Sequence, residues 1–269
     1  MSSRCLALCS WSLQPENPSD LIEKVKLCGI KAIQLALVPL VEERTWHGSI
    51  STFKDEKIDI VSGMLETVGE DYSTLETIEK TGGLRPDSTW HKTLERATRV
   101  ATIAAEMGLE LVTFHAGFLQ EESCSERNTM LARLETLGDI FGDHSIQLAL
   151  ETGQEDAHTL LGVLEELSHP MIGVNFDPAN MILYGKGDPI EALERLKPWV
   201  KQVHIKDAIP SQTKGEWGFE VPVGEGEVDW RSFLKHVPED VNLVIERESG
   251  KDRVRDIQGA IQLLKRIDE

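Results

Sequence analysis

Residues Ile146 to Gly153 read IQLALETG, an apolar run that ends abruptly in the carboxylate of Glu151. Three further apolar runs end in polar residues in the same way: 172–177 (IGVNFD), 200–207 (VKQVHIKD) and 241–248 (VNLVIERE). Glu151, Asp177 and Glu246 each come five residues after the start of their run, and His204 comes four residues after the start of its own. The spacing indicates four equivalent strand ends.

Runs of Val, Ile and Leu are typical of parallel strands that are buried on both faces of a sheet. In an α/β barrel, the carboxyl ends of such strands surround the active site. Three carboxylates and one imidazole converging there would be held together by a cation. The pattern therefore predicts a hard divalent metal bound by Glu151, Asp177, His204 and Glu246.

Eight strand-like runs alternate with helical patterns along the whole chain. The runs begin near Cys5, Ala32, Ile58, Leu109, Ile146, Ile172, Val200 and Val241. The clearest helical pattern spans Ser88 to Met107, with Asp87 as the expected N-cap and Gly108 as the stop. Further helices are expected at 19–28, 122–138, 156–167, 189–196, 230–236 and 253–266, and the connection 41–57 is the weakest. Because no linker interrupts the alternation, residues 1–269 are predicted to form a single (β/α)8 TIM barrel.

Two long connections break this rhythm on the side where the strands end. Residues 66–87 follow the third strand, and residues 208–229 follow the seventh. Long structured insertions at that face of a barrel usually cover a ligand. We therefore expect both connections to border the site.

Composition narrows the classes of partner. The 269 residues are 40% hydrophobic, which is sufficient for one large core, and 46 acidic against 28 basic residues give a net charge of −18. This charge disfavours a nucleic acid or an anionic membrane as partner, and no apolar run approaches the roughly 20 residues of a membrane span. Four scattered cysteines without CxxC spacing indicate reduced thiols and a cytoplasmic location.

Six short motifs carry a resemblance to a known family. They are TFHAG (113–117), ALETG (149–153), NFDPAN (175–180), VHIKD (203–207), VGEGEVDW (223–230) and VIERE (244–248). In this order they resemble the sugar isomerase/epimerase branch of the xylose-isomerase-like barrels, a superfamily that includes ketose 3-epimerases, inosose dehydratases and endonuclease IV. The resemblance extends from the fourth strand to the end of the chain, whereas residues 1–100 match only in strand rhythm.

The resemblance implies one divalent metal ion (manganese, magnesium or cobalt, with zinc possible) and an acid/base pair formed by Glu151 and Glu246. The implied reaction is proton transfer next to the carbonyl of a sugar or sugar phosphate, through an enediolate whose charge the metal stabilises. Return of the proton to the same carbon from the opposite face gives epimerisation, and its return to the neighbouring carbon gives isomerisation. Homo-oligomers are common in the family. Predicted substrate contacts are His115, Lys206, Gln154, Asn180 and Arg247.

Other reactions remain open at this point. Loss of a β-hydroxyl after the same proton abstraction would make the protein an inosose-type dehydratase. A metal-dependent phosphodiesterase or endonuclease is disfavoured, because the nuclease branch uses additional histidine ligands. Asn180 occupies the position of one such histidine, and the third strand carries Met64 rather than a histidine. A two-carboxylate glycosidase and a binding protein without catalysis are the remaining alternatives. Lys206, Lys214 and Arg247 are the candidates for holding a phosphate.

Overall fold

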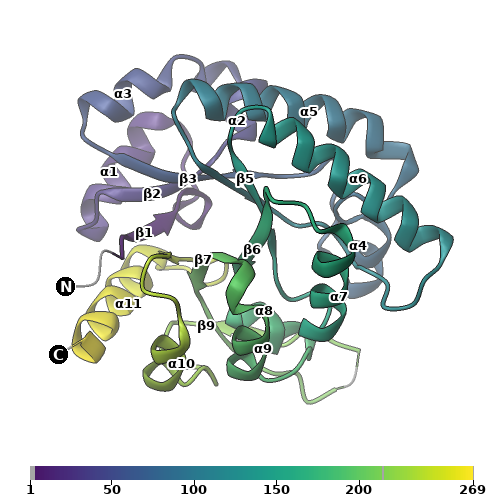
Figure 1. Cartoon of the computed structure of the whole chain (residues 1–269). Helices are drawn as coiled ribbons and strands as arrows, with labels where there is room; N and C mark the ends of the chain where they lie inside the picture. The colour runs from purple at the N-terminus through teal and green to yellow at the C-terminus, as the bar shows by residue number, and fades with distance from the viewer. Residues whose placement is uncertain (1–3, 214, 269) are drawn as a thin grey trace.

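The computed structural model of the chain describes residues 4–213 and 215–268. Eight parallel strands close into a barrel in the order β1-β10-β7-β6-β5-β4-β3-β2 (Figure 1). This confirms the predicted TIM barrel, and each of the eight predicted runs contains one barrel strand. The strands are β1 (Leu6–Cys9), β2 (Ala32–Ala36), β3 (Asp59–Leu65), β4 (Leu111–Phe114), β5 (Gln147–Glu151), β6 (Ile172–Phe176), β7 (Val200–Ile205) and β10 (Asn242–Ile245).

Helices surround the barrel, and the last helix packs beside the first (Figure 1). The α-helices are α1 (Pro18–Cys28), α2 (Val38–Glu42), α3 (Ser49–Asp55), α4 (Leu75–Thr81), α5 (Asp87–Glu106), α6 (Ser125–Gly142), α7 (Ala157–Leu167), α8 (Pro178–Tyr184), α9 (Pro189–Leu196), α10 (Trp230–His236) and α11 (Arg253–Asp268). Short 3-10 helices occupy Ser10–Leu13, Arg44–Trp46 and Lys197–Trp199. Among these described helices, none is long and apolar enough to cross a membrane.

The helices depart from the sequence expectation in several places; for example, α6 spans Ser125–Gly142 where 122–138 was expected. Asp87 is the first residue of α5 rather than its N-cap, a position taken by Pro86 without a side-chain cap. The Asp87 carboxylate instead accepts a hydrogen bond from Arg133 on α6, so a tertiary ion pair replaces the local cap. The weak connection 41–57 contains the end of α2, a 3-10 turn and α3 in place of one regular helix.

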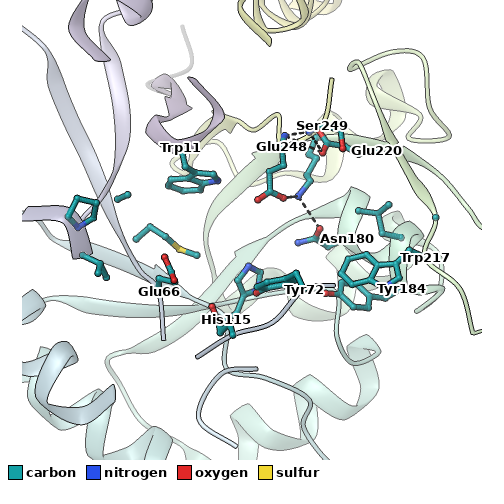
Figure 2. Close-up of a pocket in the computed structure, with 18 residues that line it drawn as sticks. Trp11, Glu66, Tyr72, His115, Asn180, Tyr184, Trp217, Glu220, Glu248 and Ser249 are labelled. Carbon is teal, nitrogen blue, oxygen red and sulfur yellow. Dashed lines mark hydrogen bonds and ion pairs between the residues drawn. The ribbon is translucent and has the colours of Figure 1, made fainter. Parts of the chain in front are cut away.

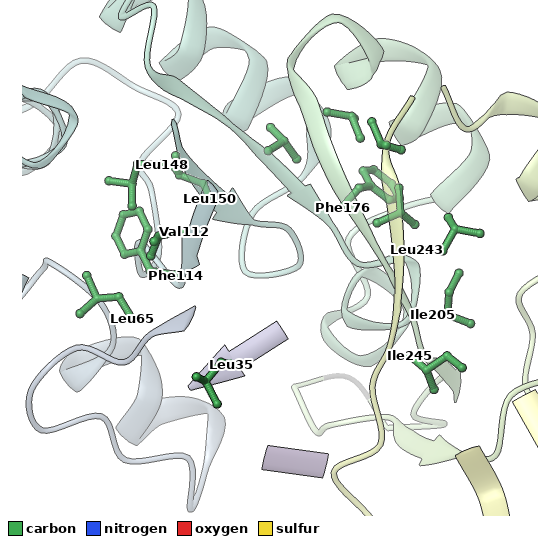
Figure 3. Packing of buried hydrophobic residues seen from close by; sticks show 14 of the residues in the cluster. Leu35, Leu65, Val112, Phe114, Leu148, Leu150, Phe176, Ile205, Leu243 and Ile245 are labelled. Atoms are coloured by element: carbon green, nitrogen blue, oxygen red, sulfur yellow. The ribbon is translucent and has the colours of Figure 1, made fainter. Parts of the chain in front are cut away.

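The strands bury two chemically different faces. Their outward side chains form a continuous apolar layer against the helices (Figure 3), and full burial of one such side chain contributes roughly 1.5–3 kcal/mol. This layer includes Leu35, Leu65, Val112, Phe114, Leu148, Leu150, Phe176, Ile205, Leu243 and Ile245. The alternate side chains point into the barrel. They include a small apolar cluster of Ala7, Cys9, Ala32 and Val244, together with the buried polar residues Gln34, Ser62, Thr113, Asn175 and Gln202.

The connection 208–229 is organised around Asp207. It forms an antiparallel hairpin of β8 (Asp207–Ile209) and β9 (Phe219–Val221). The buried Asp207 carboxylate accepts hydrogen bonds from Gly224 N at 2.8 Å, Val228 N at 3.2 Å and the Trp230 indole at 2.9 Å. A Cβ at Gly226 would lie 2.1 Å from Asp207 Oδ1. The VGEGEVDW motif therefore wraps a buried carboxylate and fixes the hairpin at the barrel mouth.

Candidate metal and active site

The four predicted metal ligands meet at the carboxyl ends of β5, β6, β7 and β10. They are Glu151, Asp177, His204 and Glu246, and together they are called the metal group. Their candidate ligand atoms all lie within 4.8 Å of one another, and each residue is at most 4% exposed. His204 lies among the three carboxylates. Its Nδ1 atom is 3.5 Å from Glu151 Oε1, 3.7 Å from Asp177 Oδ2 and 3.3 Å from Glu246 Oε2.

Two atoms of this group have no hydrogen-bond partner. Asp177 Oδ2 and His204 Nδ1 are both buried and make no hydrogen bond, although each lies within 3.9 Å of an oppositely charged or ionisable group. Burial of an unpaired carboxylate oxygen is costly unless a cation or a donor compensates it. Three carboxylates and one imidazole form a donor set that suits magnesium and several first-row divalent ions. The residues present therefore fit a divalent metal.

Local contacts orient Asp177 so that one oxygen stays available. Asp177 is the N-cap of α8, and its Oδ1 accepts a hydrogen bond from Asn180 N at 2.9 Å. The backbone N–H of Asp177 donates to Thr152 Oγ1 at 2.8 Å. Hydrogen bonds therefore connect the end of β5 (ETG, 151–153) to the motif NFDPAN (175–180) and fix their relative position. Gly153 is required here, because it has φ 134° and a Cβ on it would lie 2.4 Å from Asn180 Cβ.

Gln34 sets the tautomer of His204. Its Oε1 is 2.8 Å from His204 Nε2, while its Nε2 donates to Thr113 Oγ1 at 2.7 Å and to Gly63 O at 3.3 Å. Because both amide hydrogens are used, Oε1 faces the imidazole as an acceptor and favours the tautomer with the proton on Nε2; Asn175 Nδ2, 3.1 Å from the same nitrogen, then donates to Glu151 Oε2. A neutral His204 then carries its lone pair on Nδ1, which points toward the three carboxylates.

A buried polar layer beneath the metal group continues this arrangement. Asn175 Nδ2 donates to Glu151 Oε2 at 3.2 Å, and Gln202 Nε2 donates to Asn175 Oδ1 at 3.2 Å. Ser62 Oγ donates to Gln202 Oε1 at 2.7 Å. Sequence reasoning missed these residues. The available signal was a polar residue at an inward position of an otherwise apolar strand, such as Gln34 in AIQLA and Gln202 in VKQVHI.

The two predicted acid/base glutamates have different partners. Both oxygens of Glu246 accept strong donors, with the Trp11 indole at 2.7 Å from Oε1 and Lys206 Nζ at 3.0 Å from Oε2. Glu151 Oε1 accepts from the Asn180 amide at 2.8 Å. Lys206 also donates to Asn180 Oδ1 at 3.3 Å. A chain of hydrogen bonds therefore connects the two glutamates through Asn180 and Lys206.

Charge pairing shifts the pKa values of these groups. Burial by itself raises the pKa of Glu246, but Lys206 and His204 hold it well below the usual value. Burial lowers the pKa of Lys206, and the facing carboxylates of Glu246, Glu248 and Asp177 raise it well above normal. For Asp177, burial dominates and raises the pKa. Lys206 and Glu246 are thus a tightly held ion pair.

A cavity of about 790 Å³ (Figure 2) adjoins the metal group, because its lining residues Trp11, Asn180 and Lys206 donate hydrogen bonds to Glu246 or Glu151. Three of the predicted substrate contacts line it, namely His115, Asn180 and Lys206. Gln154 and Arg247 are buried and are not among the residues that line it. The Arg247 guanidinium is 2.9 Å from both Glu220 and Asp256. A substrate contact through Arg247 therefore finds no support in this geometry.

The two long connections supply much of the cavity wall, as expected. Aromatic side chains gather on one side, where Tyr184 and Trp217 rings lie 5.1 Å apart and Tyr72 lies 6.4 Å from Trp217 (Figure 2). Tyr72 also contacts the ring of His115 at 6.1 Å. Four carboxylates also line the cavity, beside apolar residues such as Val38, Pro39 and Met64: Glu66, Glu70, Glu220 and Glu248. Sequence reasoning singled out neither the aromatic group nor these acids.

Residues 22–267 match a family model described as a xylose isomerase-like TIM barrel. The chain belongs to the xylose isomerase-like TIM barrel family. Within that family it is similar to a xylose isomerase domain protein from Planctomyces limnophilus, whose crystal structure superposes with a TM-score of 0.85 at 30% identity, over 91% of each chain.

Two further solved structures share the fold at lower sequence identity. A D-tagatose 3-epimerase-like protein superposes with a TM-score of 0.74 at 17% identity, over 98% of this chain and 96% of its own. A xylose isomerase-like TIM barrel protein from Mycobacterium smegmatis in complex with magnesium superposes with a TM-score of 0.70 at 16% identity, over 98% of this chain and 97% of its own. The uncharacterized protein YihM of Escherichia coli K12 is 29% identical over 101 residues, which is 37% of this chain and 31% of YihM.

Proposed function

We propose that this protein is a divalent-metal-dependent sugar isomerase or epimerase that moves a proton at a carbon next to a carbonyl. The observation that carries the proposal is the placement of Glu151 and Glu246. These buried glutamates lie 3.5 and 3.3 Å from His204 Nδ1, and they accept hydrogen bonds from Asn180 and Lys206, which line the cavity. The epimerase-like structural relative is consistent with this chemistry.

Each residue of the group has a definable task in this reaction. A divalent ion held by the four ligands would supply positive charge to the oxygen that becomes negative when the adjacent carbon loses its proton. One glutamate accepts that proton, and the other donates a proton to the product. Trp11 and Lys206 orient Glu246. Asn180 orients Glu151.

Proton NMR in heavy water tests the proposal. The protein would be stripped of metal, loaded with magnesium, and incubated with ketoses, ketose phosphates and inososes. The proposal predicts that deuterium enters one carbon next to the carbonyl while the elements of water are retained. Loss of water from the product would instead identify a dehydratase, which uses the same first step.

Glu246→Gln tests the acid/base assignment, because it keeps the shape of the side chain and removes its proton-accepting carboxylate, although its one amide oxygen can accept from only one of Trp11 and Lys206. We expect deuterium uptake to fall by at least about a hundredfold. Glu239→Gln, which lies outside the cavity lining and the metal group, is the control and should leave uptake unchanged. Uptake at the wild-type rate in Glu246→Gln would remove Glu246 from the catalytic pair.

A further inference from the structure

The charge of the cavity wall bears on the substrate. Lys206 is the only lysine or arginine among the described residues that line the cavity. An ammonium group has three donors, and those of Lys206 already face Asn180 Oδ1 at 3.3 Å, Glu246 Oε2 at 3.0 Å and Glu248 Oε2 at 2.5 Å. A phosphate or carboxylate on the substrate would therefore find no unpaired lysine or arginine in this wall.

The surrounding acids reinforce this conclusion. A divalent ion and the Lys206 ammonium together balance the three carboxylates of the metal group. The four glutamates that line the cavity, Glu66, Glu70, Glu220 and Glu248, then add further negative charge. Of these, Glu220 forms an ion pair with Arg247 at 2.9 Å. Glu66 and Glu70 lie in the wall contributed by the connection after β3. Carboxylates accept hydrogen bonds from hydroxyl groups but repel anions.

The size and shape of the cavity indicate more than one sugar ring. Cavities of roughly 300–1,000 Å³ usually hold drug-sized ligands, and a volume of about 790 Å³ exceeds what one sugar ring fills. The rings of Tyr72, Trp217 and Tyr184 form a row that begins beside His115, whose Nε2 is 3.7 Å from Glu151 Oε1. Figure 2 shows this row on the side of the cavity away from Trp11. Tyr72 is 43% exposed, although it is a large aromatic side chain.

We propose that the cavity takes an uncharged glycoside, in which a keto sugar lies at the metal group and a second ring packs on Tyr72, Trp217 and Tyr184. This inference rests on the proposed function and deepens it. The aromatic rings offer flat apolar surfaces to the C–H face of the second ring. Glu66 and Glu70 accept hydrogen bonds from its hydroxyl groups.

Binding measurements with defined ligands test the substrate class without requiring turnover. The magnesium-loaded full-length protein would be titrated with the ketose disaccharides lactulose, isomaltulose and turanose, and with fructose and fructose 6-phosphate. We expect at least one disaccharide to bind about tenfold more tightly than fructose. Fructose 6-phosphate should bind no more tightly than fructose.

Variants of the aromatic row locate the second ring. Trp217→Ala should weaken disaccharide binding about tenfold and leave fructose binding within about twofold. Phe219→Ala is the matched control, because Phe219 lies on the same hairpin, is 66% exposed and does not line the cavity. Phe219→Ala should change the affinity for neither the disaccharide nor fructose. If Trp217→Ala does not fold, the half-exposed Tyr72 allows the same comparison through Tyr72→Ser.

Three results would overturn the inference: tighter binding of fructose 6-phosphate than of fructose, no disaccharide that binds more tightly than fructose, or an equal loss for fructose and disaccharide in the aromatic variants. Deuterium exchange separates this inference from the proposed function. Exchange with fructose 6-phosphate alone would uphold proton transfer and overturn the uncharged glycoside. A disaccharide that binds as expected but never exchanges would support the substrate class and contradict proton transfer.

Discussion

Gln34 Oε1 accepts a hydrogen bond from His204 Nε2 at 2.8 Å, across 170 residues of sequence. Gln34 itself is held by Thr113 and by Gly63. The contact turns the lone pair of a neutral His204 toward Glu151, Asp177 and Glu246. The orientation of this proposed metal ligand therefore depends on a residue far away in the sequence.

Gln34→Leu should weaken manganese binding roughly 10–100-fold, because the partner that orients a ligating histidine is lost. Gln34→Glu keeps an acceptor at the same position and should retain most of the affinity. Ser62→Ala is the control, since it removes a hydrogen bond from the same polar layer without touching His204. Isothermal titration calorimetry measures the affinities. Equal weakening in Gln34→Leu and Ser62→Ala would mean that Gln34 only stabilises the barrel.

Lys206 and Glu246 should be strongly coupled in the metal-free protein. Removing one member of a buried pair leaves an unpaired charge, so Lys206→Met should lower the free energy of unfolding at pH 7 by roughly 3–5 kcal/mol. Adding Glu246→Gln to Lys206→Met should cost less than the sum of the two single changes. Urea unfolding of the four proteins completes the cycle, and additive effects would exclude the coupling.

The same pair predicts a pH window. The folded pKa of Glu246 is lowered, so its contribution to stability is present above its usual pKa and is lost as the pH falls. The folded pKa of Lys206 is raised, so its contribution is present below its usual pKa and is lost as the pH rises through the folded value. The difference in unfolding free energy between the metal-free wild type and Lys206→Met should therefore shrink in acid. A difference that grows as the pH falls below 4.5 would contradict the assignment.

Glu155 should make the protein less stable at alkaline pH. This carboxyl group is 8% exposed, and burial raises its pKa from 4.5 to about 8. Between these values the folded state binds more protons than the unfolded chain, so the free energy of unfolding falls as the pH rises. Glu155→Gln should be more stable than wild type by roughly 2–4 kcal/mol at pH 8 and equally stable at pH 4. Glu165→Gln on the exposed face of α7 is the control. The absence of a pH-dependent gain in Glu155→Gln would refute the raised pKa.

Asp207 should control the order of the connection 208–229. Asp207→Asn places an amide N–H against donors that now meet a carboxylate, at a cost of roughly 1–3 kcal/mol. We expect faster proteolytic cleavage within this connection. Asp229→Asn is the matched control at its far end, because asparagine caps a helix as well as aspartate does. Mass spectrometry after limited digestion maps the cleavage sites, and equal cleavage in the two variants would argue against this role of Asp207.

The sequence predicted what depends on periodicity. Buried parallel strands must be apolar, and the first charged residue after each run marks the place where the chain leaves the core. Glu151, Asp177, His204 and Glu246 were singled out in this way, and the structure brings their side chains within 4.8 Å of one another. Arg247 illustrates a misleading neighbour, since successive residues alternate in direction along an extended chain and Glu246 points inward. Arg247 accordingly pairs with Glu220 and Asp256.

Contacts between distant segments could not be predicted in this way. The Trp11 indole reaches Glu246 across 235 residues, and the unpaired state of Asp177 Oδ2 becomes evident only after every other donor has been placed. The aromatic row brings together Tyr72, Tyr184 and Trp217 from three separate connections. The periodicity of a single sequence does not indicate which side chains from separate connections will pack together.

The binding of one divalent ion by the four-residue group is tested most directly by crystals soaked in manganese, with anomalous diffraction data. We predict one strong peak in contact with His204 Nδ1, Asp177 Oδ2 and the carboxylates of Glu151 and Glu246, and its loss in His204→Ala. A map without density at this position, with manganese bound instead at the glutamates that line the cavity, would contradict the account.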